Sequence, residues 1–278
     1  MSSQRIKFNL FLLVLLSALF VELSIAELTE KSEQSRLTED TVHADAFRRQ
    51  KVEPAMAAYI RTLDQPGENL ALYWLETDFG KERMETVWGA ETLADFRQKW
   101  KNHPDYPEYR KWCSAIYDDA KCFPVPKFIE KRAGVTFEDS WMYERNYGGK
   151  SGHEGCDIMA GENIRGYYPV LSMTDGTVTQ KGWLPKGGYR IGVMSDHAVY
   201  FYYAHLDSYA DLEEGDRVKS GELLGFMGDS GYGETEGTVG KFPVHLHIGI
   251  YLCEGTEEIS VNPYALLHYL EDKKIKIW

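Results

Sequence analysis

Several patterns that identify a protein class directly are missing from this sequence. Its 278 residues include 31 lysines and arginines against 43 aspartates and glutamates, which gives a net charge of −12. Binding to a phosphate backbone requires clustered basic residues, so we do not expect a nucleic-acid partner. Four cysteines are present, but no two have the C-x-x-C spacing of a structural zinc site or a redox pair. We therefore expect one or two structural disulfides, or buried thiols.

Two further absences concern metal chemistry and architecture. The chain contains no H-E-x-x-H motif, which excludes the glutamate base of the zinc proteases that carry this motif. It also contains no internal repeat and no low-complexity tract. Its length suffices for one good-sized domain, a smaller one and a hydrophobic core.

The N-terminus has the layout of a secretory signal. Arg5 and Lys7 precede an apolar stretch from Leu10 to Val21, and Ser24–Ala26 offers a small-x-small cleavage site. The apolar run is short for the roughly 20 residues of a spanning helix, which favours a cleaved signal over an uncleaved anchor. Residues 1–26 are thus a signal peptide or an N-terminal anchor, and the rest of the chain is expected outside the cytoplasm.

The first half of the remaining chain shows a helical pattern. Residues 27–50 are polar and charged and are predicted to form a linker. In residues 51–130, Pro54 suits the first turn of a helix that ends before Pro66. Apolar residues also recur at helical spacing, at Leu93, Phe96 and Trp100 and again at Tyr109, Trp112 and Ile116. Such a stripe is usually core, so we expect a small helical domain of unknown role.

Residues 131–278 are typical of an antiparallel β domain. Glycines become frequent, and Tyr, Val and Ile gather in short runs bounded by turn signals. The clearest strand alternates without a fault: one face carries Val244, Leu246, Ile248, Ile250 and Leu252, and the other carries His245, His247, Gly249 and Tyr251. The predicted fold class is α+β, with an antiparallel β-sheet domain after a small helical domain.

Three segments carry candidate site residues, and none is decisive alone. The pair His245 and His247 lies on one strand face, where an isolated H-x-H is more often structural than metal-binding. His153 and Asp157 belong to a glycine-rich segment that favours a loop entering a strand over a helix. An imidazole and a carboxylate suit a catalytic zinc site, which uses three protein ligands; taken alone, this segment is better explained as a solvated turn.

The third segment is an aromatic strand that ends in a histidine. Alternation places Val199, Phe201, Tyr203 and His205 on one face. A lone histidine in this position is more often a core or rim residue than a catalyst.

In combination, these segments resemble the lysostaphin-like family of zinc endopeptidases, which cut cell-wall peptides. The order is H-x-x-x-D at 153–157, Y-x-H-L at 203–206 and H-x-H at 245–247, and residues 214–225 resemble the family's hairpin. The resemblance covers about residues 145–265 and does not reach the helical segment.

The resemblance implies a role for each site residue. His153, Asp157 and His247 would bind one zinc ion per chain, and His205 and His245 would face the substrate as the acid–base and polarising groups. Without H-E-x-x-H, histidine is also the base that the sequence itself suggests.

By the same resemblance, residues 131–278 would form a zinc endopeptidase domain that acts on the peptide part of peptidoglycan. Tyr147 and Tyr203 are candidates to line the substrate groove, together with Tyr202 and Tyr251. The protein would be a bacterial one, secreted or anchored outside the cytoplasm.

Two other classes of function compete with this interpretation. A catalytically silent wall-binding or regulatory module on the same fold would typically have lost ligands, whereas all five site positions are filled here. A carrier domain is suggested by residues 214–225, which also resemble the half-hairpin of lipoyl and biotinyl domains. Such domains need a modified lysine at a hairpin tip in a short motif, and the sequence has none.

Overall fold

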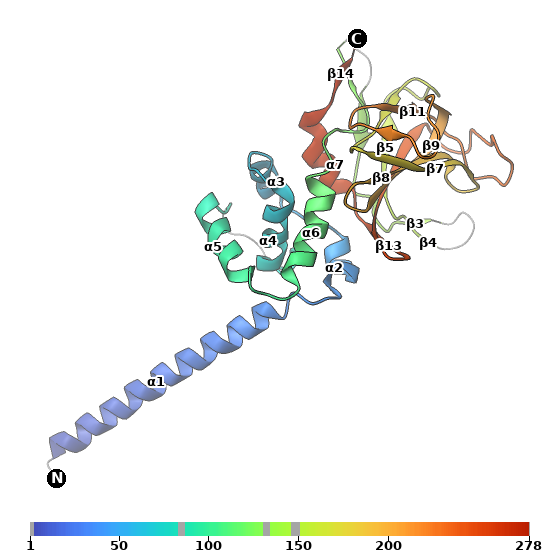
Figure 1. Ribbon diagram of the computed structural model, residues 1–278. Coiled ribbons are helices and arrows are strands. Elements are labelled where there is room, and N and C mark those ends of the chain that lie inside the picture. The colour runs from blue at the N-terminus through green and yellow to red at the C-terminus, as the bar shows by residue number, and fades with distance from the viewer. Residues whose placement is uncertain (1–2, 83–86, 130–133, 146–150, 278) are drawn as a thin grey trace.

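The computed structural model describes residues 3–82, 87–129, 134–145 and 151–277 (Figure 1). Helix α1 (Ser3–Gln34) projects away from the rest of the molecule, and its apolar side chains are exposed. By length and composition it is apolar enough to cross a membrane, although signal sequences pass the same test. The helix continues beyond Ala26, so a signal and an anchor are both compatible with it.

The helical region packs around one buried helix. Its elements are η1 (Thr41–His43), α2 (Asp45–Arg48), α3 (Pro54–Ile60), α4 (Pro66–Glu76), α5 (Ala90–Trp100) and α6 (Tyr106–Tyr117). Helix α4 is the centre, because every residue from Gly67 to Leu75 is buried. No helical spacing in the sequence indicated this helix. The helix predicted from Pro54 does end before Pro66, since α3 ends at Ile60, but Pro66 also begins α4, where its missing N–H and fixed φ suit a first turn.

Part of the predicted linker packs against this region. Leu37, Val42 and Phe47 are buried, and the Phe47 ring contacts those of Trp74 and Tyr109 edge-on. The apolar residues in this charged segment are so sparse that they form no helical or strand periodicity in the sequence. The packed helical region therefore begins before residue 50.

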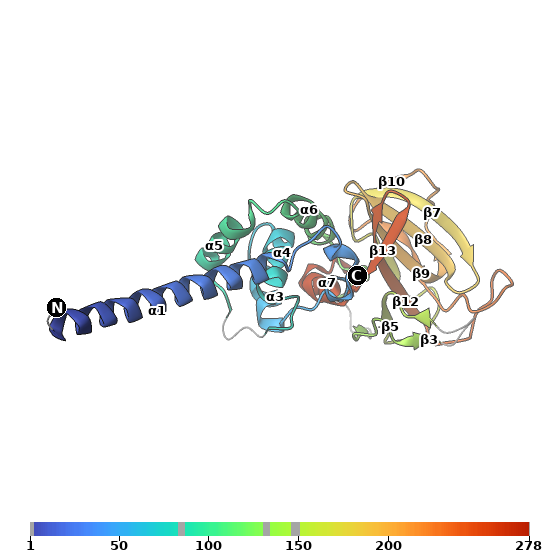
Figure 2. The same ribbon diagram turned by 90° about the horizontal axis from the view of Figure 1, so that it is seen from below.

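The β domain lies on the far side of the helical region from α1 (Figure 2). Its elements are β1 (Lys127–Phe128), β2 (Val135–Phe137), β3 (Glu144–Arg145), β4 (Ser151–Gly152), β5 (Cys156–Ala160), β6 (Pro169–Leu171), β7 (Gly176–Leu184), β8 (Gly188–Ser195), β9 (Val199–Tyr209), β10 (Arg217–Val218), β11 (Leu223–Met227), β12 (His245–Glu254), β13 (Glu257–Val261), α7 (Tyr264–Leu270), η2 (Glu271–Lys273) and β14 (Lys276–Ile277). The main sheet has ten strands with a central order β10-β7-β8-β9-β12-β5-β2, and its pairings are antiparallel. The predicted α+β class, with helices before an antiparallel sheet, is confirmed.

The predicted alternation along β12 is also confirmed. Val244, Leu246, Ile248, Ile250 and Leu252 are at most 2% exposed and form part of the core. The predicted hairpin at 214–225 is wrong in its pairing: β10 pairs with β7, whereas β11 pairs with β6 and β9. All four cysteines are free, and three of them are buried, so the thiol alternative holds.

Candidate active site

Strands β5 and β12 bring a carboxylate and an imidazole together. They pair antiparallel, and Asp157 lies directly opposite His247 in the register. Residues opposite each other in a sheet project to the same face. As a result, Oδ1 of Asp157 lies 3.0 Å from Nδ1 of His247.

His153 reaches the same point from the loop that precedes β5. Its Nδ1 lies 3.0 Å from the carbonyl oxygen of Ser140, and because a carbonyl only accepts, Nδ1 carries the proton. The other nitrogen, Nε2, lies 2.8 Å from Nδ1 of His247 and 3.1 Å from Oδ1 of Asp157. The Ser140 carbonyl thereby fixes both the ring orientation and the tautomer, as partners of metal-binding histidines do.

These three side chains are able to hold a metal ion, and their chemistry fits zinc. One ligand atom from each of His153, Asp157 and His247 lies within 4.8 Å of the others. The separations of 2.8–3.1 Å compare with roughly 3.3 Å between the ligand atoms of a tetrahedral zinc ion. Burial alone would raise the pKa of Asp157, but hydrogen bonds with the two histidines outweigh it and hold that pKa below its usual range, so the carboxyl is ionised.

A glycine makes room for this cluster. A Cβ on Gly155 would lie 2.4 Å from Cε1 of His247 and 2.5 Å from the Ile248 carbonyl oxygen. Any side chain at this position would displace the His247 ring. The predicted loop entering a strand is confirmed here, since β5 begins at Cys156.

His205 joins the site because β9 carries a bulge. Ala204 and His205 together lie opposite the single residue Arg190 of β8, and His205 has a φ of +64°. The extra residue reverses the alternation of side chains beyond it. The prediction that His205 shares a face with Tyr203 is therefore wrong. The His205 ring instead lies 6.0 Å from the ring of His247.

His205 and His245 form a second imidazole pair, with ring centroids 4.7 Å apart. Nδ1 of His205 donates to the Ser230 carbonyl and Nδ1 of His245 donates to the Pro243 carbonyl, each over 2.8 Å. Each ring therefore turns its Nε2 away from those carbonyls, and Nε2 of His245 lies 3.9 Å from Oδ1 of Asp157. Burial, reinforced by the charges of neighbouring histidines, lowers the pKa of His205 well below its ordinary value, so this ring is neutral near pH 7.

A cavity of about 220 Å³ opens over these groups. Its lining includes three of the five predicted site residues, and the whole set is Gly152, His153, Glu154, Lys186, Gly187, Tyr202, Ala204, His205, Tyr232, His247 and Tyr251. Tyr232 and Phe242 were not predicted. They pack edge-on against His205, and they follow glycine-rich sequence without strand periodicity, so no signal marked them.

Two tyrosines were predicted to line the substrate groove, and the structure describes only one of them. Tyr203 is 0% exposed, and its hydroxyl accepts a hydrogen bond from the Met173 N–H over 2.8 Å. It faces the core and does not line the cavity, so that prediction is wrong. Tyr147 lies outside the described residues.

Two sequence profiles match the chain. Residues 32–119 match the LytM N-terminal domain, and residues 151–263 match peptidase family M23. The L-Ala–D-Glu endopeptidase of Bacillus subtilis is 40% identical over 150 residues, which are 54% of this chain and 43% of that protein. The glycyl-glycine endopeptidase ALE-1 of Staphylococcus capitis is 31% identical over 117 residues, which are 38% of this chain and 31% of that protein. The chain thus spans less than half the length of these curated relatives.

One solved structure is similar over almost its whole length. It comes from Ruminococcus gnavus, is named as a candidate glycyl-glycine endopeptidase LytM, and is 53% identical to this chain. The TM-score is 0.83, with 88% of this chain and 98% of the other covered. With the fold, the profiles and this relative in agreement, the chain belongs to peptidase family M23 and carries a LytM N-terminal domain before the peptidase domain.

Proposed function

We propose that the chain is a zinc-dependent endopeptidase that hydrolyses peptide bonds in the peptide part of peptidoglycan, outside the cytoplasm. The observation that carries the proposal is the convergence of His153 Nε2, Asp157 Oδ1 and His247 Nδ1 within 2.8–3.1 Å of one another. A buried cluster of two imidazoles and an ionised carboxylate is the ligand set of a catalytic zinc site with one position left open.

In this proposal His153, Asp157 and His247 hold one zinc ion per chain. Bound there, zinc supplies Lewis acidity, which makes water more acidic and polarises the scissile carbonyl. Ser140 keeps the Nε2 lone pair of His153 turned toward the other two ligands.

His205 and His245 then carry out the proton transfers. Their Nδ1 atoms donate to backbone carbonyls, which leaves Nε2 of each ring for proton transfer. One imidazole accepts the proton of the attacking water at Nε2, and the other, protonated at Nε2, donates a hydrogen bond to the developing oxyanion. The proton is later returned to the leaving amine. The His205 ring is neutral near pH 7, so its Nε2 has a lone pair that can accept the proton.

The relatives support the reaction class. The two curated ones are named as endopeptidases, for an L-Ala–D-Glu and a glycyl-glycine bond. Tyr202 and Tyr251 line the cavity beside His247 and offer flat surfaces for a peptide. In this proposal residues 131–278 form the catalytic domain, residues 51–130 with the packed part of 27–50 form the helical domain, and α1 is a signal or an anchor.

Digestion of purified peptidoglycan by the full chain, followed by mass spectrometry of the released fragments, tests this function. Release that is lost with a chelator, restored by zinc and lost in His205→Ala is expected. The new amino terminus would name the bond. Bound zinc without release from several wall types would instead favour the catalytically silent binding or regulatory module.

A further inference from the structure

The candidate metal ligand His153 is held by a single turn of the chain, residues 139–143. Its Nδ1 donates to the Ser140 carbonyl over 3.0 Å. The backbone of His153 makes two further hydrogen bonds with the same turn: its N–H donates to the Tyr143 carbonyl over 3.0 Å, and its carbonyl accepts from the Met142 N–H over 2.8 Å. A displacement of the turn therefore moves the His153 ring or breaks its contact with Ser140.

This turn has a backbone conformation that needs support from its surroundings. Met142 has a φ of +59°, in the left-handed region that residues other than glycine seldom occupy. The sequence has no glycine at 139–143 that would adopt it without strain. Such a conformation persists only where the surrounding contacts hold it.

Asp139 supplies one of these contacts. Its Oδ1 accepts a hydrogen bond from the Trp141 N–H, two residues further along the chain, over 3.2 Å, which forms an Asx turn. The bond spans Ser140 and so fixes the direction in which the Ser140 carbonyl points. Asp139 is exposed, so water competes for its carboxylate, and a buried partner is needed to keep Oδ1 in place.

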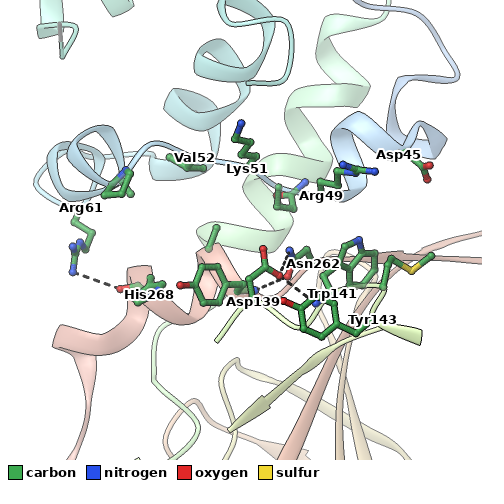
Figure 3. A pocket seen from close by; sticks show the side chains of 16 residues that line it. Asp45, Arg49, Lys51, Val52, Arg61, Asp139, Trp141, Tyr143, Asn262 and His268 are labelled. Atoms are coloured by element: carbon green, nitrogen blue, oxygen red, sulfur yellow. Dashed lines mark hydrogen bonds between the residues drawn. The ribbon is translucent and has the colours of Figure 1, made fainter. Parts of the chain in front are cut away.

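Asn262 is that buried partner, as Figure 3 shows. It is 4% exposed, and its Nδ2 donates to the same Oδ1 atom of Asp139 over 3.0 Å. The Oδ1 atom of Asn262 accepts from the Tyr264 N–H over 3.0 Å, so the amide cannot turn over without losing both bonds. The backbone N–H of Asn262 donates to the Arg48 carbonyl over 2.8 Å. Asn262 thus joins the helical region, the start of α7 and the 139–143 turn.

Arg48 of α2 fixes the position of Asn262 from the helical side. The Nε of Arg48 donates to the Ser260 carbonyl over 2.9 Å, and its Nη2 donates to the Ser260 hydroxyl over 2.7 Å. Ser260 lies two residues before Asn262 and is 3% exposed, so water has little access to these bonds. A continuous series of hydrogen bonds therefore runs from α2 through Asn262 to the turn that holds His153.

We propose that Asn262 and Asp139 are positioning residues, which keep His153 in the tautomer and orientation that a metal ligand needs. Asn262 holds Asp139, Asp139 directs the Ser140 carbonyl, and this carbonyl accepts the Nδ1 proton, which leaves the Nε2 lone pair for the metal. Neither positioning residue lines the cavity of about 220 Å³, so both act through His153. In naming a metal the proposal rests on the proposed function, whereas the tautomer is a property of the metal-free chain.

The test measures the His153 tautomer and the zinc affinity separately. The full chain is labelled with ¹⁵N-histidine, kept in detergent and freed of metal with a chelator. Long-range ¹H–¹⁵N correlation spectra then report which ring nitrogen carries the proton, and His153→Gln assigns the His153 signals. Zinc affinity is measured on the same samples by competition with a chromophoric chelator, and the melting temperature of each variant is recorded.

Asp139→Ala and Asn262→Ser each break one link of the series. The serine hydroxyl is still able to accept from the Tyr264 N–H, but it is too short to reach Asp139. Asp139→Asn is the conservative variant, because it keeps the Oδ1 acceptor. The matched controls are Asp211→Ala, at another exposed aspartate outside the site cavity, and Asn69→Ser, at an asparagine of α4 that is also 4% exposed.

We expect the wild-type chain to carry the His153 proton at Nδ1. Asp139→Ala and Asn262→Ser should show a mixture of both tautomers and bind zinc about tenfold more weakly, the lower end of the cost of a lost ligand partner. Asp139→Asn and the two controls should keep the wild-type tautomer, with zinc affinity within about twofold of wild type.

An unchanged His153 tautomer in both Asp139→Ala and Asn262→Ser would overturn the proposal. The same holds for an equal change in Asn69→Ser, or for a failure of Asp139→Asn to keep the wild-type tautomer. A wild-type chain that neither binds zinc nor digests peptidoglycan would contradict the proposed function instead, and the tautomer spectra would still decide the positioning role.

Discussion

Asp157 and His247 lie directly opposite each other on β5 and β12, with 3.0 Å between Oδ1 and Nδ1. The sheet register alone therefore assembles two of the three candidate metal ligands. The third, His153, is positioned by the Ser140 carbonyl rather than by the sheet.

His247→Ala removes one ligand and leaves two. We expect zinc affinity and turnover each to fall by at least about 100-fold, because even a lost partner of a ligand costs 10–100-fold. Zinc content after dialysis and the rate of peptidoglycan digestion are the measurements. A variant that keeps one zinc per chain would show that His247 is not a ligand.

Gly155→Ala tests the same cluster without removing any ligand. The added methyl would meet the His247 ring at 2.4 Å, so we expect zinc affinity to fall at least about tenfold. Gly134→Ala is the matched control, since a Cβ there meets nothing within 4 Å. Equal zinc affinity in the two variants would contradict the close approach of the Gly155 backbone to the His247 ring.

Hydrophobic periodicity explains which elements of the fold could be predicted from the sequence. The strand at β12 was predictable because five buried aliphatic residues alternate with the histidines, and that alternation fixes the face of His247. Helix α4 was not predictable in the same way. It is buried on all sides, so it has no polar face to produce a helical pattern.

His205→Ala should keep zinc and lose turnover. The imidazole touches the cavity but is not one of the three clustered ligands, and loss of an acid–base group costs roughly 10²–10⁴-fold. Zinc content and digestion rate, measured on the same preparation, separate the two effects. A near-normal rate would make His205 a rim histidine only.

The low pKa of His205 also predicts a pH dependence of stability. Burial, then the charges of His245 and His247, lower this pKa below the 6.5 of the unfolded chain. Below about pH 6.5 the unfolded chain therefore binds the proton more strongly, and stability falls as the pH falls, by at most about 1.4 kcal/mol per pH unit. Chemical denaturation of chelated protein from pH 5 to 8 measures the slope. His205→Gln should have a shallower one, and identical slopes would contradict the assignment.

Tyr203→Phe should affect stability but not catalysis. The Met173 N–H would lose its acceptor inside the core, which costs about 1–3 kcal/mol of unfolding free energy. Tyr202→Phe is the comparison, because that ring lines the cavity. Thermal melting and digestion rates should separate the two variants, and a lost rate with normal stability in Tyr203→Phe would restore its predicted place in the groove.

The error over Tyr203 and His205 has one physical origin. Strict alternation puts both residues on the same face, and the sequence contains no proline or glycine at 203–206 to announce a bulge. The family motif Y-x-H-L identified the histidine without revealing how the backbone turns it toward the cavity.

The bulge in β9 also limits how this site can be moved to another protein. On a regular strand, a histidine two residues after Tyr203 would point into the core beside it, away from the other imidazoles. A graft that copied only the side chains onto an ideal sheet would therefore misplace His205. The irregular backbone around His205, whose φ is +64°, has to be transferred together with the side chains.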